Sequence, residues 1–300
     1  MLHLNLINVI KFITSHPFNK GKKLSALSRF LKYQVAIRLI KSKFLIDWVD
    51  DSKFLVSAGE TGLTGNLYCG LMEYKDMCFL LHFSNQTDTF YDIGANVGAY
   101  TILASSVNKM NSICFEPLPS TYDRLLDQIK VNRIDNLVEA RNNGVGKNSE
   151  VLEFTNNLNC TNRVNTDPSN TDVTKVDVIT LDDCYEPTNP SIVKIDVEGY
   201  EKFVFEGGMK FFDNPNVVAL IVELNGSGDT FGIDDSEVHK TITSFGFRPV
   251  AYDPFSRKIS SLDSFVGEEN TIYVKDLDDA QNRVSISPSI CIQTANKLTI

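Results

Sequence analysis

The sequence predicts an α/β fold built around a parallel sheet, and three observations support this prediction. Short apolar runs alternate with segments of helical periodicity from residue 90 to residue 274. A glycine-containing turn follows the first of these runs, at the point where a strand would pass into a helix. Acidic residues follow several later runs, where the carboxyl ends of parallel strands form one edge of a sheet. We therefore expect an open α/β sheet with a ligand site at that edge.

The turn at residues 92–98 has the composition of a nucleotide-type binding turn. Gly94 and Gly98 allow the backbone to take positive φ or to approach a ligand, and the following helix aims free N–H groups at the same point. The spacing differs from the Gly-x-Gly-x-x-Gly of dinucleotide sites. Asp92 would repel a pyrophosphate but would suit a sulfonium or ammonium charge. Glu116 ends the next predicted strand, where its carboxylate can accept both ribose hydroxyls. This combination fits S-adenosylmethionine.

The remaining elements follow from local periodicity and turn signals. Residues 66–72 are predicted to form a short strand, and Tyr74, Met77, Cys78 and Leu81 recur at helical spacing. Ser120 is the expected cap of a helix after the second strand. The predicted helices are 74–82, 99–107, 120–131 and 234–245. The predicted strands after the first, at 90–92, are 112–115, 137–141, 176–181, 192–195, 217–222, 247–252 and 270–274, the last two forming an antiparallel hairpin.

Residues 155–175 are the most polar stretch of the chain and contain six Asn with little periodicity. A loop of this length in a compact domain usually has a function. We expect it to act as a lid or as a flap that recognises the methyl acceptor.

Three acids and an amide follow two neighbouring predicted strands. Asp196 and Glu198 follow the strand at 192–195, and Glu223 and Asn225 follow the strand at 217–222. This group can bind a divalent cation, activate an acceptor hydroxyl, or contact a sulfonium. Carboxylates without histidine resemble a Mg²⁺ site only loosely. We therefore expect a metal-free general base and predict no metal ligands.

The chain resembles the FkbM family of S-adenosylmethionine-dependent methyltransferases, from about residue 60 to about residue 275, through four motifs in the family's order. These are Gly65-Asn66-Leu67-Tyr68-Cys69-Gly70-Leu71-Met72-Glu73, Asp92-Ile93-Gly94-Ala95-Asn96-Val97-Gly98, Phe115-Glu116-Pro117 and Lys194-Ile195-Asp196-Val197-Glu198-Gly199-Tyr200-Glu201. The resemblance implies a class I methyltransferase Rossmann-like sheet with strand order 3-2-1-4-5-7-6. It also implies a cofactor site formed by Glu73, Asp92, Gly94, Ala95, Asn96, Gly98, Glu116, Pro117 and Asn143.

Two of these cofactor residues have a competing structural interpretation. Glu73 could instead be a carboxylate that offsets the dipole at a helix N-terminus. Asn143, expected near adenine, could instead serve an Asn-Gly turn.

The expected reaction is methyl transfer to a hydroxyl, with Asp196, Glu198, Glu223 and Asn225 around the acceptor. Family members act on sugars, glycans and related hydroxyl-bearing metabolites, so we expect such a molecule as the partner. The alternatives are an NAD(P)-dependent Rossmann oxidoreductase, which the missing second glycine disfavours, and a catalytically silent adaptor that keeps the fold.

Length and charge suggest three parts: a basic helical extension (1–55), a methyltransferase domain (56–280) and a C-terminal extension (281–300). Residues 1–50 contain nine Lys or Arg and two Asp, whereas the whole chain has a formal net charge of −9. The acidic remainder argues against a nucleic-acid partner. No apolar run is long enough to span a bilayer.

The basic extension allows two interpretations. Lys22, Arg29 and Lys32 fall on one side of a helix, opposite Leu24 and Val35. The helix could contact a membrane surface or another protein. We favour a helix packed on the catalytic domain with its basic face in solvent.

The cysteines favour a reducing, cytoplasmic location. Six of them are scattered without a C-x-x-C pair, and most lie in apolar segments. They are Cys69, Cys78, Cys114, Cys160, Cys184 and Cys291.

Overall fold

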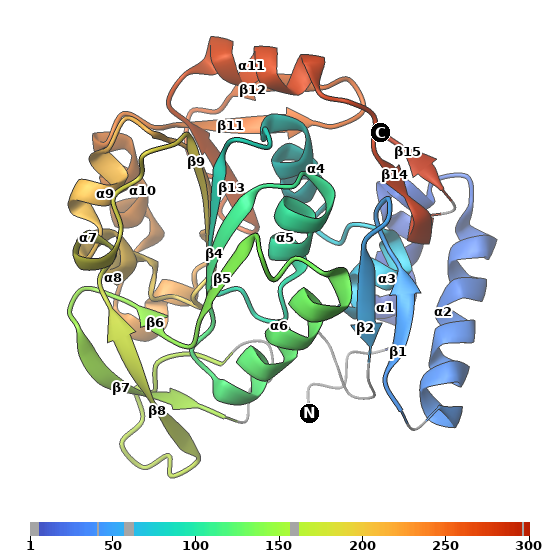
Figure 1. Cartoon of the computed structure of the whole chain (residues 1–300), viewed down its shortest axis with the longest axis horizontal. Coiled ribbons are helices and arrows are strands. Elements are labelled where there is room, and N and C mark those ends of the chain that lie inside the picture. Colours follow the sequence, from blue (N-terminus) through green and yellow to red (C-terminus); the bar gives the residue numbers. More distant parts are fainter. Residues whose placement is uncertain (1–5, 41, 57–62, 157–161, 296) are drawn as a thin grey trace.

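A computed structural model describes residues 6–40, 42–56, 63–156, 162–295 and 297–300. Its centre is an eight-stranded sheet with the order β12-β11-β13-β10-β9-β3-β4-β5 (Figure 1). The strands are β3 (Thr89–Ile93), β4 (Asn111–Phe115), β5 (Val138–Arg141), β9 (Ser191–Ile195), β10 (Val217–Glu223), β11 (Arg248–Asp253), β12 (Lys258–Ser261) and β13 (Asn270–Val274). Strands β10, β9, β3, β4 and β5 are parallel, and β13, β11 and β12 are antiparallel. Of the eight strands expected from residue 90 onward, the one at 176–181 lies in a separate sheet. If the other seven are numbered along the chain, their order in the central sheet is 3-2-1-4-5-7-6, and β12 adds an unexpected edge strand.

Helices cover both faces of the sheet because neighbouring strand residues point to opposite sides. Phe90 faces α4 and α5, whereas Tyr91 joins the apolar cluster formed with α8, α9 and α10. The helices are α4 (Tyr74–Phe83), α5 (Ala99–Ile102), α6 (Pro119–Asn132), α7 (Leu181–Cys184), α8 (Glu201–Glu206), α9 (Met209–Asp213), α10 (Asp235–Ser244) and α11 (Leu277–Ile286). The prediction of Ser120 as a cap is wrong, because α6 begins at Pro119 after Leu118.

A small second sheet pairs the two ends of the loop expected at 155–175. Strand β7 (Glu150–Thr155) pairs with β8 (Val173–Ile179), which also pairs with β6 (Gly144–Val145). Strand pairing therefore holds the ends of the loop but shortens it only by residues 155 and 173–175. Residues 157–161, which include Cys160 and part of the first half of the expected flap, lie outside the described residues.

The N-terminal extension contains helices and a hairpin. Its helices are α1 (Leu6–Ser15) and α2 (Lys23–Leu39), with a 3₁₀ turn (Pro17–Asn19) between them, and β1 (Phe44–Asp47) pairs with β2 (Lys53–Val56). The strand predicted at 66–72 is wrong, because this segment forms α3 (Thr64–Cys69). Its helical residues from Gly65 to Cys69 are all buried, so no polar side alternates with an apolar one to indicate a helix.

The C-terminal segment lies against the N-terminal extension. The short strands β14 (Cys291–Ile292) and β15 (Leu298–Thr299) pair, and Val49 forms a bridge with Ile292. Figure 1 shows this pair beside the N-terminal extension. Helix α11 crosses the boundary expected at residue 280 and buries Ala280 and Val284.

Helix α2 is turned opposite to the orientation favoured from sequence. Ala26, Phe30 and Tyr33 are buried, whereas Leu24 and Val35 are exposed. Arg29, expected on a solvated face, donates to the main-chain oxygen of Tyr68 at 2.7 Å. The expected orientation is therefore wrong. None of the helices among the described residues has the length and apolar composition needed to cross a membrane.

Candidate active site

The turn after β3 packs directly against the end of β9. Gly94, Asn96 and Gly98 all have positive φ, as the glycine spacing indicated for two of them. A Cβ atom on Gly94 would lie 1.8 Å from the main-chain oxygen of Asp196. Only glycine allows this approach, because any side chain would force the two strand ends apart.

Glu116 is held in a fixed orientation at the end of β4. Its two carboxylate oxygens accept the backbone N–H groups of Asn96 and Leu118, each at 3.0 Å. Burial raises the pKa of Glu116 to about 7, although these two hydrogen bonds oppose the shift. Each oxygen keeps a further lone pair that can accept a ribose hydroxyl.

Glu116 lines a pocket that has the composition expected of an adenosine site. The pocket is bounded by the glycine turn, the end of β4 and the second sheet, and Asn143 lies on its wall. The Asn143 side-chain amide donates to the main-chain oxygen of Asp177 at 3.1 Å. The other residues that line this pocket include Gly94, Asn96, Pro117, Phe154, Asp196 and Glu198.

A second pocket of about 220 Å³ lies on the other side of the turn. Gly94, Asn96, Asp196 and Glu198 line both pockets, so the two adjoin at the ends of β3 and β9. The second pocket is also lined by Glu73, Asp92, Ala95, Tyr100, Lys194 and Glu223. The predicted cofactor residues are thus divided between two adjoining spaces.

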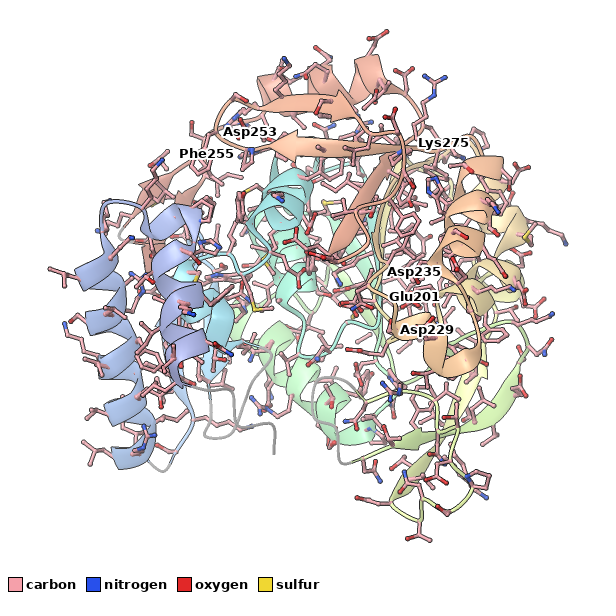
Figure 2. The ribbon with its side chains drawn as sticks, turned by 180° about the vertical axis from the view of Figure 1, so that it is seen from behind. Glu201, Asp229, Asp235, Asp253, Phe255 and Lys275 are labelled. Carbon is pink, nitrogen blue, oxygen red and sulfur yellow. The ribbon has the colours of Figure 1, made fainter. Side chains whose placement is uncertain are left out.

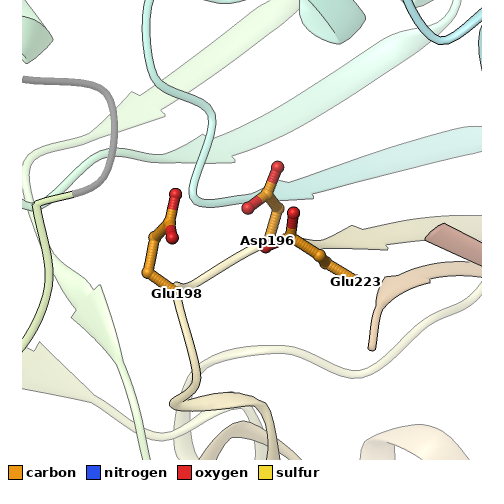
Figure 3. A group of neighbouring side chains, drawn as sticks. All are labelled: Asp196, Glu198 and Glu223. Atoms are coloured by element: carbon orange, nitrogen blue, oxygen red, sulfur yellow. The ribbon is translucent and has the colours of Figure 1, made fainter. Parts of the chain in front are cut away.

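Three carboxyl groups meet where the pockets adjoin. Asp196, Glu198 and Glu223 each have an oxygen within 4.8 Å of the others, at the ends of β9 and β10 (Figure 3). Burial acts to raise the pKa of Asp196, but the charge and hydrogen bond of Lys194, with a hydrogen bond from Glu223, lower it overall. Burial and the Asp196 charge raise the pKa of Glu223 to about 10. One proton is therefore held between these two groups, on the Glu223 side, at neutral pH.

Glu198 differs from the other two acids in its backbone and its neighbours. Burial and the Asp196 charge raise the pKa of Glu198 to about 7, while Arg163 opposes the rise. Glu198 has a φ of +57°, in the left-handed region that is strained for glutamate. Glu201 stabilises this turn by accepting the N–H groups of Val197 at 3.1 Å and Gly199 at 3.2 Å.

Glu73 belongs to a polar network on the far wall of the second pocket. Its carboxylate accepts the Tyr100 hydroxyl at 2.5 Å and the Asn270 amide at 3.0 Å. Asn270 also donates to Asp76 at 3.3 Å. Glu73 is also the N-cap residue of α4, although its side chain makes no capping hydrogen bond, so its carboxylate lies both at the helix end and on the pocket wall.

Asp92 and Asn225 occupy contrasting positions. Asp92 is buried in the pocket wall and accepts the Thr101 hydroxyl at 2.6 Å, and burial raises its pKa to about 6. Asn225 is exposed and accepts the N–H of Ser227 at 2.9 Å. It is not among the lining residues of either pocket, so the structure does not bring Asn225 to the acceptor as predicted.

Lys194 and Tyr100 are functional candidates that were not predicted from the sequence. Lys194 is buried, contacts Asp196 at 2.6 Å, and has its ammonium 4.8 Å from the centre of the Tyr100 ring. The available signal was a lysine inside the apolar run 192–195, two residues before an acid. A charge at such a position is rarely buried without a partner.

The parallel sheet, the glycine turn and the facing carboxylate define a Rossmann-like α/β protein with a nucleotide-type site. Residues 92–249 match the Methyltransferase FkbM domain, which is more than half of the chain. The chain belongs to the FkbM methyltransferase family. The prediction of the family, and with it of S-adenosylmethionine as the cofactor, is confirmed.

One relative and two solved structures add detail. Hexuronic acid methyltransferase AglP from Haloferax volcanii is 30% identical over 167 residues, covering 55% of this chain and 65% of that protein. The match therefore spans less than two thirds of the relative. A precorrin-6y C5,15-methyltransferase from Geobacter metallireducens has a TM-score of 0.40 at 12% identity, and the match covers 74% of this chain and 93% of the methyltransferase. An rRNA methylase from Streptococcus thermophilus has a TM-score of 0.35 at 12% identity, and the match covers 66% of this chain and 91% of the methylase. Likenesses this weak give no residue-level correspondence.

Proposed function

We propose that the protein is an O-methyltransferase that methylates a hydroxyl group of a sugar, a glycan or a related metabolite. The observation that carries this proposal is the group of three carboxyls at the junction of two pockets, one of which has the features of an adenosine site. The similarity to a hexuronic acid methyltransferase supports a carbohydrate acceptor.

The residues present suit the cofactor in distinct ways. Glu116 offers two oriented oxygens to the ribose, and Asn143 lies where it could contact the base. Asp92, Asp196 and Glu198 give the junction a negative potential that would stabilise a sulfonium charge. When bound, S-adenosylmethionine supplies an electrophilic methyl group whose bond to sulfur breaks as the acceptor oxygen forms its new bond.

The protein's contribution to the reaction is positioning and proton removal. The second pocket would hold the acceptor oxygen about 3 Å from the methyl carbon and in line with the breaking bond. Asp196 or Glu198 would take the hydroxyl proton. At neutral pH Lys194 keeps Asp196 ionised and able to accept a proton, whereas Glu198, with a pKa of about 7, is the stronger base but is ionised in only part of the molecules.

The proposal is tested by incubating purified protein with methyl-labelled S-adenosylmethionine and a panel of acceptors. The panel contains neutral oligosaccharides, uronic-acid oligosaccharides and the same sugars with their hydroxyls blocked. We expect release of S-adenosylhomocysteine and labelling of at least one sugar, lost when hydroxyls are blocked. Binding of NAD(P) without binding of S-adenosylmethionine would favour the oxidoreductase. Cofactor binding without turnover on any acceptor, in cell extract as well, would favour the silent adaptor.

A further inference from the structure

Helix α2 carries an apolar stripe that faces away from the rest of the protein. Leu24, Leu31, Val35 and Leu39 are 85%, 60%, 56% and 76% exposed. Their spacings of seven, four and four residues place them on one side of the helix. The buried face, with Ala26, Phe30 and Tyr33, is on the opposite side. A single exposed leucine needs no explanation, but a stripe along a whole helix is typical of a binding surface.

Further exposed apolar side chains lie beside the start of α2. Phe255, on the turn between β11 and β12, is 58% exposed, and its ring lies 5.8 Å from that of Phe18. Figure 2 shows Phe255 near the end of the N-terminal helices. Leu6 and Ile7 at the start of α1 are also exposed. Exposed apolar side chains are therefore also present on α1 and on the turn between β11 and β12.

Unpaired lysines border this apolar surface. Lys20, Lys22 and Lys23 line a groove with Phe18 and Phe255. Lys11 and Lys32 project from the middle of α1 and α2. All five lysines are exposed, and none forms an ion pair with another described residue. The basic charge of the extension is thus available to an external partner.

We propose that α1, α2 and Phe255 form a surface that docks on an anionic lipid membrane, with α2 lying in the plane of the interface. The exposed leucines would enter the boundary between headgroups and acyl chains, and the lysines would contact the lipid phosphates. The rest of the chain is acidic, so an anionic surface would attract the extension and repel the remainder. This charge asymmetry would fix which face approaches the membrane.

The charge distribution disfavours a second copy of the chain as the occupant. A two-fold contact through the stripe would place the same surface on both subunits, so the lysines of one copy would face those of the other. An anionic lipid surface has no such conflict.

The proposal is tested by flotation of the full chain with vesicles of phosphatidylcholine alone or mixed with phosphatidylglycerol. We expect binding to the anionic vesicles only, weakened by salt. The double variant Leu31→Glu with Val35→Glu should lower binding by about tenfold or more, and so should Lys22→Glu with Lys23→Glu. Val151→Glu, at an exposed apolar position on β7, is the matched control and should bind like the unchanged protein.

Two measurements keep the test decisive. Circular dichroism and S-adenosylhomocysteine binding should be the same in all variants, because the substituted side chains are exposed and none of them lines either pocket. Absence of flotation with anionic vesicles would overturn the proposal. So would a dimer, seen by light scattering, that Leu31→Glu with Val35→Glu dissociates while flotation is unchanged, since the stripe would then bind a second copy.

Discussion

Lys194 and Asp196 form an ion pair at the end of β9, with 2.6 Å between the ammonium nitrogen and a carboxylate oxygen; the lysine is buried and the aspartate side chain is 27% exposed. The two residues lie on the same face of the strand because they are two positions apart. Lys194 is only 3% exposed, and Glu73 and Asp92 also act on its charge. Burial alone would favour a neutral lysine, but these acids raise its pKa, so it stays charged. A permanent positive charge therefore stands behind the proposed base.

The first prediction concerns Lys194→Met. Removing the ammonium should raise the pKa of Asp196, so the acid limb of the kcat profile should move to higher pH. Each unit of that shift lowers activity about tenfold on the acid side of the profile. Lys194→Arg should restore most of the activity because it retains the charge. A profile that falls in height without shifting would show that Lys194 does not act on the base.

The second prediction distinguishes a metal-free base from a cation at the three carboxyls. Asp196→Asn should lower kcat about 10²- to 10⁴-fold while cofactor affinity changes little. A chelator should have no effect on the unchanged protein. Turnover that a chelator abolishes and Mg²⁺ or Mn²⁺ restores would instead assign the cluster to a cation.

The third prediction concerns cofactor affinity. Glu116→Ala removes an oriented charged acceptor and should weaken S-adenosylhomocysteine binding at least about tenfold, since such hydrogen bonds contribute roughly 1.5 to 3 kcal/mol each. Glu139→Ala, at an exposed position on the neighbouring strand β5, serves as the control. Titration calorimetry of both variants gives the comparison. Equal affinities would remove Glu116 from the site.

The fourth prediction separates crowding from backbone strain in the glycine turn. Gly94→Ala places a Cβ against the Asp196 main chain and should lower both thermal stability and cofactor affinity. Gly246→Ala is a matched control, because Gly246 has a φ of +85° but no atom within 4 Å of the added Cβ. It should show only the cost of the strained φ. Similar losses in the two variants would mean that contact with β9 is unimportant.

The fifth prediction concerns the pH dependence of stability at Asp76. Burial and the Glu73 charge raise its pKa to about 8, so its folded form binds a proton that the unfolded chain releases near pH 4. The stability from this group is therefore lost as the pH rises through about 8. Asp76→Asn should unfold at a higher temperature than the unchanged protein at pH 9, with a smaller difference at pH 6. Asp263→Asn, at an exposed position, should show no such pH dependence.

The strands and the cofactor turn could be predicted because their signals are local. Gly94 and Gly98 indicate positive φ, and acids after apolar runs indicate the carboxyl edge of a sheet. Helix α3 could not be predicted, because burial on all sides removes the periodicity that identifies a helix. The orientation of α2 depends on which of its two apolar faces meets α3. Leu24 and Phe30 are equally apolar, so periodicity does not distinguish the buried face from the exposed one.

In the candidate site, too, some features could be predicted from local sequence and others depend on packing. Asp196, Glu198 and Glu223 could be expected to meet because they follow neighbouring strands. The protonation of Glu223 and the role of Lys194 depend on distances and burial that no spacing reveals. Asn225 follows the same strand as Glu223, but Glu223 lines the second pocket whereas Asn225, two residues later, is exposed.

The N-terminal extension is continuous with the wall of the active site. Arg29 of α2 donates to Tyr68 of α3, Trp48 donates to the main-chain oxygen of Gly70 at 2.5 Å, and the Asn66 side chain accepts the N–H of Met72 at 2.8 Å. Asn66 and Met72 line the second pocket. A chain shortened to begin at residue 56 would therefore lose contacts that hold one wall of the second pocket. The activity of such a fragment would be lower than that of the full chain. The extension is therefore better described as part of the methyltransferase domain than as a separate segment.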